Sequence, residues 1–196
     1  MKKIKKLVVA EKTVYTVGYL RQVSWHTLDS AINSKKGSYL NLIASAVFSA
    51  FTIEAYLNHL GEEIIPFWPI VERSLGPSDK LELIAMQLRK HINYGRRPFR
   101  SFKPIFQFRN FLAHGRTEHL TEKGVQYLSD GDIPKLPKTK WQNQITEKNI
   151  RQYFDDTKEM IEYLHNASGL EFNPLGVPEM GGWAISGISM GDEEKA

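Results

Sequence analysis

The chain has 196 residues, a formal net charge of +4 and no cysteine. That length suits one domain with a hydrophobic core of its own. The lack of cysteine excludes disulfides, thiolate zinc sites and cysteine nucleophiles. The six histidines show no paired metal-ligand spacing and no acidic cluster accompanies them, so we expect neither a metal site nor a cofactor.

The amino-terminal segment starts with lysines, but residues 7–10 are its only apolar run before Glu11. A signal peptide needs roughly 7 to 15 apolar residues. The longest uncharged run, residues 37–53, contains several serines and falls short of the roughly 20 apolar residues that span a bilayer. We therefore expect a cytoplasmic protein that does not bind membranes, with a buried core helix in this run.

Hydrophobic periodicity predicts two helices in the first third of the chain. The first covers residues 14–36. The second covers residues 39–60, is apolar almost all round and is rich in small residues, which is typical of the central helix of a bundle. We expect Gly61 to close it. Glu54 and Asn58 are four residues apart and share one of its faces, where the carboxylate needs a partner.

Three further helices are predicted in the rest of the chain. Residues 78–93 suit a third helix capped by Ser78, and Pro104 suits the first turn of a fourth that ends near Gly115. Residues 146–167 keep the helical period to the end of a last helix. The acidic residues that we expect on its exposed face are Asp155, Asp156, Glu159 and Glu162.

These patterns predict an all-α fold: a bundle of about five helices within residues 1–168, followed by a Gly-rich irregular arm over residues 169–196. Residues 121–144 lose the helical period and form an exposed excursion, either a loop or a short β-hairpin. The hairpin would use Val125, Tyr127 and Ile133. The arm contains Trp183, Ile185, Ile188 and Met190, unlike a solvated end, so we expect it to pack on its own bundle or a neighbour's.

Residues 89–117 carry basic side chains and no aspartate or glutamate. A stretch whose charged side chains are all positive suits binding to a polyanion, because the neutralisation of phosphates releases counterions. The interleaved Phe99 and Phe102 could stack on bases or anchor the core. The alternative is a solvated basic loop. The candidate RNA-binding residues are Arg96, Arg97, Arg100, Lys103 and Arg116.

Arg109, Asn110 and His114 lie where the fourth predicted helix ends. At about 100° per residue, Asn110 and His114 are roughly 40° apart on one face, whereas Arg109 and His114 are roughly 140° apart. Histidine transfers protons near neutral pH and arginine binds phosphate, so these types suit proton transfer beside a bound phosphate. Arg21 and His26 have the same spacing, but His26 lies beside Trp25 in an apolar pattern and we expect it to be structural.

The run Arg109-Asn110-x-x-x-His114 resembles the R-x4-6-H signature of the HEPN family. The resemblance implies a helical-bundle homodimer that cleaves RNA without metal by attack of the ribose 2′-hydroxyl. Arg109 and His114 from both subunits would line one cleft, Asn110 would position the nucleotide, and Glu54 would orient Arg109 or its copy in the dimer. It also implies a toxin or defence component with an antitoxin or nucleotidyltransferase partner.

Two alternatives remain open. One is a catalytically inactive HEPN-like module that binds RNA or protein. The other is a structural helical protein without a nucleic-acid role, for which residues 89–117 would be basic by accident. Glu54 could equally form a structural salt bridge with any basic residue.

Overall fold

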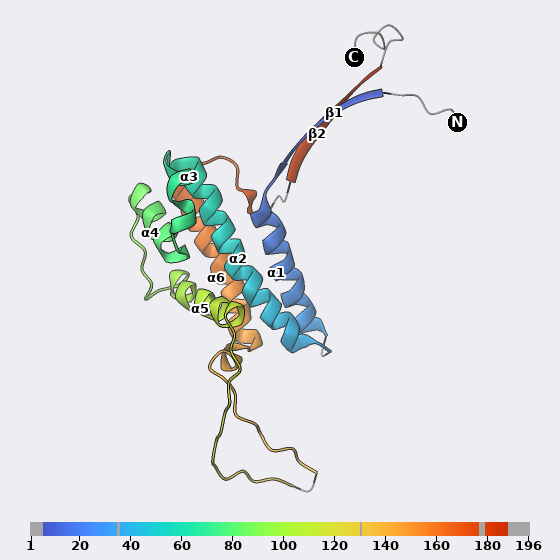
Figure 1. The fold of residues 1–196 in the computed structure, drawn as a ribbon, viewed down its shortest axis with the longest axis vertical. Coiled ribbons are helices and arrows are strands. Elements are labelled where there is room, and N and C mark those ends of the chain that lie inside the picture. Colours follow the sequence, from blue (N-terminus) through green and yellow to red (C-terminus); the bar gives the residue numbers. More distant parts are fainter. Residues whose placement is uncertain (1–5, 35, 130, 177–178, 188–196) are drawn as a thin grey trace, which may run out of the picture.

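A helix forms in each of the five predicted places, and the all-α bundle is confirmed. The computed structural model describes residues 6–34, 36–129, 131–176 and 179–187. Over these residues the elements are, in chain order, β1 (Lys6–Val14), α1 (Thr16–Asn33), α2 (Ser38–Ile64), α3 (Trp68–Val71), α4 (Pro77–Gln87), α5 (Phe102–Ala113), α6 (Glu147–Ser168) and β2 (Glu179–Gly187). Figure 1 shows the bundle with a two-stranded ribbon leaving one end and a long loop leaving the other.

Helix α2 is the centre of the bundle and packs against α1, α4, α5 and α6. Its small residues Ser45, Ala46, Ser49 and Ala50 are buried and let α1 approach closely. Ser24 of α1 donates a hydrogen bond to the backbone oxygen of Ser45 at 3.0 Å, and its Oγ lies 2.9 Å from Oγ of Ser49. Small serine side chains that contact one another through their hydroxyl groups therefore lie between the two helices, where bulky apolar side chains would hold them further apart.

Among the described helices, α2 alone is long and apolar enough to cross a membrane, judged by length and composition. Half of its most apolar window is buried inside the protein. Helices α1, α4, α5 and α6 pack against it, so it serves as the predicted core helix, which is compatible with a soluble protein.

The prediction that Gly61 closes this helix is wrong, because α2 continues to Ile64. The glycine instead makes room for Trp68, which is 1% exposed at the start of α3. A Cβ atom at position 61 would lie 2.3 Å from Cε2 of the indole, so any side chain there would displace the ring.

The other helix ends follow ordinary capping chemistry. Helix α4 begins with Pro77, one residue before the Ser78 predicted to cap it, and the Asp79 carboxylate accepts a hydrogen bond from the backbone nitrogen of Gly76 at 3.2 Å. Thr146 caps α6, and Gly169 ends it in the left-handed region with φ of 72°.

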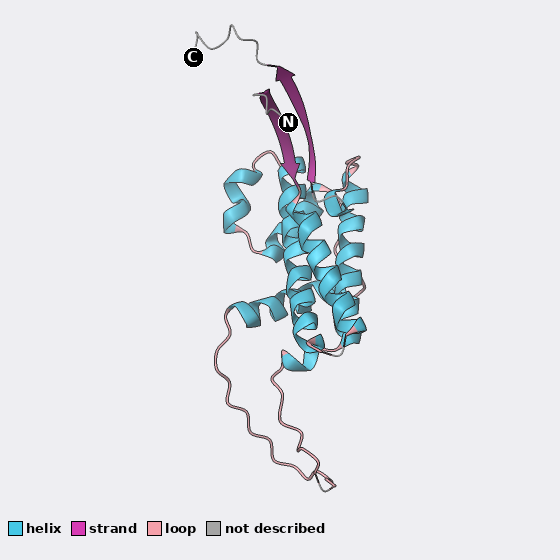
Figure 2. Cartoon of the chain, turned by 90° about the vertical axis from the view of Figure 1, so that its right-hand side faces the viewer, coloured by secondary structure: helices cyan, strands magenta, loops and turns pink. Residues whose placement is uncertain are grey.

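The excursion between α5 and α6 is a loop, drawn in pink in Figure 2, and its described residues within 121–144 hold no strand. The side chain of Gln126 joins its two arms, donating to the backbone oxygen of Lys135 at 3.0 Å and accepting from its nitrogen at 2.8 Å. Pro134 and Pro137 lack the backbone donors that a strand ladder needs, which explains why the described residues of the excursion form no hairpin.

The strands come instead from the two ends of the chain. β1 and β2 pair antiparallel, from Lys6 opposite Gly187 to Val14 opposite Glu179. The ribbon leaves the bundle at the end opposite the loop (Figures 1 and 2). Before β2, the arm packs on its own bundle through Leu175, which is buried, and Phe172, whose ring lies 4.9 Å from that of Tyr15. Ile188 and Met190 of the predicted apolar arm lie outside the described residues.

Candidate functional site

Helix α5 presents the candidate residues through its amphipathic pattern. Ile105 and Phe108 are fully buried, Arg109 is partly buried, and Asn110 and His114 are exposed. Ala113 is the last helical residue, and His114 follows as the C-cap, its backbone nitrogen donating to the oxygen of Asn110 at 3.0 Å. His114 therefore lies at the carboxyl end of α5, with its side chain exposed.

Arg109 forms an ion pair with Glu54 of the same chain, which fits both the pairing that the resemblance implied and a structural salt bridge. Its Nη2 donates to Oε2 of Glu54 on α2 at 2.7 Å, and the two side chains are 20% and 29% exposed. The guanidinium carbon also lies 5.4 Å from the centre of the Phe106 ring. The arginine thus faces α2, and its buried Nε has no hydrogen-bond partner among the described groups.

Asn58, which shares a face of α2 with Glu54, does not join this pair. Its Oδ1 accepts a hydrogen bond from Nζ of Lys80 at 2.7 Å, and Lys80 is only 5% exposed. The amide therefore satisfies a buried lysine between α2 and α4.

Asn110 and His114, which their spacing predicted to share one face of the helix, both line one surface hollow. This hollow has a volume of about 540 Å³ and is lined by Gln107, Asn110, Phe111, His114, Lys140 and Gln144. A second, of about 340 Å³, has a lining that includes Phe111, His114, Arg116, Glu118 and Trp141. Arg109 lines neither hollow. One copy of the chain therefore separates the guanidinium from the imidazole, in line with their predicted divergence.

The predicted RNA-binding residues divide into two groups. Arg96, Arg100 and Lys103 are exposed, and Nζ of Lys103 lies 4.8 Å from the centre of the Tyr94 ring. Arg116 is exposed and lines the smaller hollow. Arg97, in contrast, has a partner inside the protein.

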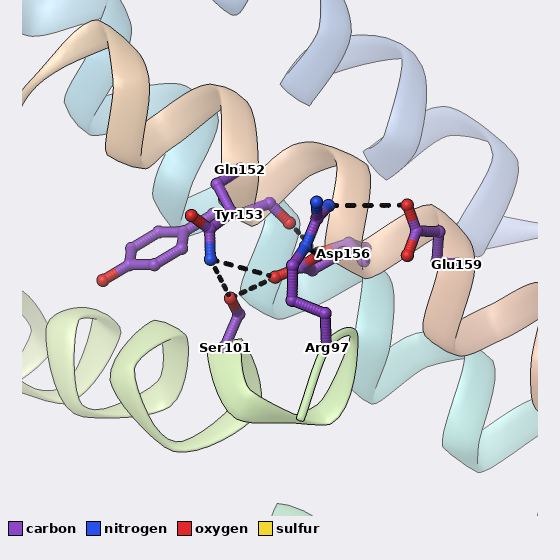
Figure 3. A network of polar contacts seen from close by, with 7 residues as sticks. Arg97, Ser101, Gln152, Tyr153, Asp156 and Glu159 are labelled. Atoms are coloured by element: carbon purple, nitrogen blue, oxygen red, sulfur yellow. Dashed lines mark hydrogen bonds and ion pairs between the residues drawn. The ribbon is translucent and has the colours of Figure 1, made fainter. Parts of the chain in front are cut away.

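Arg97 binds Asp156 of α6, the centre of the polar network in Figure 3. Its Nε donates to Oδ1 of Asp156 at 2.5 Å, and its Nη2 lies 3.4 Å from Oε1 of Glu159. Ser101 donates to the other carboxylate oxygen, and Gln152 donates to Ser101 at 3.3 Å. The hydrogen bond and charge of Asp156 raise the pKa of Arg97.

The prediction that Asp156 lies on an exposed face is wrong, since its side chain is fully buried. A buried carboxylate requires hydrogen bonds and a cation, which Ser101, Gln152 and Arg97 provide. Arg97 therefore has a structural partner that the sequence did not reveal.

Arg21 and His26, which have the same spacing as Arg109 and His114, lie on α1. Their side chains contact different residues. The guanidinium carbon of Arg21 lies 5.9 Å from the centre of the Phe154 ring on α6. His26 is exposed, with its ring 4.7 Å from that of Trp25.

No group of three or more histidine, aspartate or glutamate side chains in the described part of the chain could hold a metal ion. The sequence did not single out Gln107, Phe111, Lys140, Trp141 and Gln144 as site residues, although they line the hollows beside His114. Three of these come from the turn before α6, and no motif connects that turn to α5. No family model, curated protein or solved structure matches the chain.

Proposed function

We propose that this protein is a metal-independent endoribonuclease of the HEPN type that acts as a homodimer. The observation that carries the proposal is the exposed His114 at the end of α5, which shares a hollow with Asn110. Five residues earlier, Arg109 is held by Glu54 at 2.7 Å. Proton transfer, hydrogen bonding and phosphate binding are the capabilities that RNA transesterification requires.

The reaction forms a bond between the ribose 2′-oxygen and its own 3′-phosphorus while the bond from phosphorus to the 5′-oxygen breaks. A base removes the 2′-hydroxyl proton, and an acid gives a proton to the leaving oxygen. The products are a 2′,3′-cyclic phosphate and a 5′-hydroxyl. An imidazole titrates near neutral pH and can act in either role, while Asn110 positions the nucleotide.

A dimer supplies what one chain lacks. Each copy has one such histidine, so separate acid and base roles call for two copies facing across a two-fold axis. The same arrangement brings the guanidinium of one copy toward the imidazole of the other. Glu54 occupies one of the five N–H donors of Arg109, and others can bind phosphate oxygens once RNA enters.

The decisive experiment is cleavage of total RNA by the wild-type protein and by His114→Ala, with excess EDTA present. We expect the wild type to leave ends with 2′,3′-cyclic phosphate and His114→Ala to be inactive. His26→Ala, also an exposed histidine after an arginine, is the matched control and should cleave normally. Equal cleavage by His114→Ala, or cleavage that EDTA stops and only Mg²⁺ or Mn²⁺ restores, contradicts the proposal.

A second candidate is an inactive HEPN-like module that binds RNA or protein. The contact that favours it is the Glu54–Arg109 ion pair, which engages the guanidinium within a single copy. RNA binding that weakens with salt, without cleavage products on a denaturing gel, would identify this module. For either candidate we propose a toxin or defence component in the cytoplasm, paired with an antitoxin or a nucleotidyltransferase.

A further inference from the structure

We infer that the two hollows beside His114 bind the two nucleotides on either side of the scissile phosphate, the larger by reading a base and the smaller by stacking. This inference rests on the proposed ribonuclease function. It assigns binding roles to Gln107, Phe111, Trp141 and Gln144.

The placement of the hollows is the first argument. A phosphodiester joins two nucleosides, so a group that transfers protons at the phosphate must lie between two nucleoside sites. Phe111 and His114 line both hollows, so they stand at the boundary between them. With volumes of about 540 and 340 Å³, both lie in the range of small-molecule sites.

The larger hollow has the chemistry of a base-reading site. Gln107 and Asn110 are three residues apart on α5 and both exposed, and Gln144 joins them from the turn before α6. A carboxamide has a donor beside an acceptor, which matches the edge of a nucleobase in unpaired RNA. The Tyr153 hydroxyl lies 3.2 Å from Oε1 of Gln144 and orients that amide.

Phe111 supplies the stacking surface of this hollow. Its side chain is 48% exposed, although phenylalanine has no polar group to satisfy in water. Exposed aromatic rings that stack on bases are the common device of proteins that bind single strands. Lys140, on the rim of the same hollow, offers a cation for a neighbouring phosphate.

The smaller hollow is suited to stacking without a base preference. Trp141 packs near the core, with its ring centre 6.4 Å from that of the buried Phe108. It lines the hollow together with Arg116. A flat indole accepts any base, and an arginine binds phosphate without regard to sequence. Glu118 also lines this hollow and carries a negative charge that repels phosphate. A phosphate should therefore bind on the side of the hollow near Arg116.

Binding can be measured separately from cleavage with 2′-fluoro tetranucleotides, which lack the attacking hydroxyl. We expect Phe111→Ala to weaken binding at least roughly fivefold and Phe111→Tyr to keep wild-type affinity. Phe67→Ala is the matched control, because Phe67 is also 48% exposed but lies at the start of α3. Wild-type affinity of Phe111→Ala would overturn the inference, as would an equal loss in Phe67→Ala.

Base reading is tested with tetranucleotides that differ at a single position. Gln107→Ala should reduce the differences in affinity among the four bases at one position. Trp141→Phe should leave those differences unchanged, but should reduce the quenching of tryptophan fluorescence on binding. If the wild-type protein cleaves RNA but Gln107→Ala keeps every base preference, the subsite assignment is wrong, while the proposed ribonuclease function is supported. If wild-type protein binds these tetranucleotides as described but cleaves no RNA, the nuclease fails.

Discussion

Nη2 of Arg109 lies 2.7 Å from Oε2 of Glu54, and this contact joins α5 to α2 beside the proposed site. Both side chains are largely but not fully buried, so we expect a coupling free energy of about 1 kcal/mol between Glu54→Gln and Arg109→Gln. Chemical denaturation of the two single variants and the double variant measures it. The exposed pair Glu147 and Arg151 on α6 is the control and should couple by about 0.3 to 0.5 kcal/mol. A coupling no larger than this control would show that the contact does not hold α5 in place.

The proposed homodimer should form along the exposed apolar stripe of α2 that leads to Glu54. Leu40 and Phe51 on this stripe are 69% and 37% exposed. We expect Leu40→Glu to convert the dimer to a 22.5 kDa monomer in analytical ultracentrifugation and to abolish cleavage, because burying an unpaired charge is unfavourable. Ile70→Glu, at an 81% exposed position on α3, is the control and should remain dimeric. A wild-type protein that is active as a monomer would contradict the shared-cleft mechanism.

Asp156 should be a major determinant of stability. Replacing it with alanine removes the acceptor for Ser101, Arg97 and Gln152 in a buried environment, so we expect the free energy of unfolding to fall by about 2 to 4 kcal/mol. Asp155→Ala, at the exposed neighbouring position, should change it by about 0.5 kcal/mol or less. Urea denaturation compares the two variants, and similar losses would contradict the network's role.

Arg97 and Arg100 should differ in RNA binding although they are close in sequence. Both arginines are exposed, but the guanidinium of Arg97 is held by Asp156, so only Arg100→Ala should reduce the slope of log affinity against log salt, by about 0.7 for one phosphate contact to a single strand. Arg97→Ala should instead lower the melting temperature. Fluorescence anisotropy at several salt concentrations measures the slope, and an equal reduction by Arg97→Ala would mean that Arg97 also contacts phosphate.

His59 should make the protein less stable in mild acid. Burial lowers its pKa below 6.5, Glu63 and Glu62 oppose this shift, and His165 adds to it. The unfolded chain therefore binds more protons than the folded one just below pH 6.5, and the free energy of unfolding falls as the pH drops through that window. Urea denaturation at pH 7.5 and 5.5 should show a smaller fall for His59→Gln than for wild type. His26→Gln, an exposed histidine, should behave as wild type; an unchanged fall in His59→Gln would contradict the assignment.

The sequence by itself determined the places of α1, α2, α4, α5 and α6 and put the end of α5 near Gly115. A helix buries one stripe of its own residues, so the period of Ile105, Phe108 and Leu112 is sufficient to place Asn110 and His114 on the other side. The spacing of Arg109 and His114 likewise determined their divergence within one copy. Local patterns are enough for these conclusions because neighbours along a helix are close in sequence.

Only the tertiary structure decided which distant residues meet. The ends of the chain pair as β1 and β2, Trp68 packs on Gly61, and Asp156 accepts hydrogen bonds from residues more than fifty positions away. The turn before α6 brings Lys140, Trp141 and Gln144 to the hollows beside His114. A hydrogen bond or a ring contact depends on where two segments of the chain lie in space. Helical periodicity predicts which face of a helix is polar, but not which distant residue an aspartate or glutamine on that face contacts.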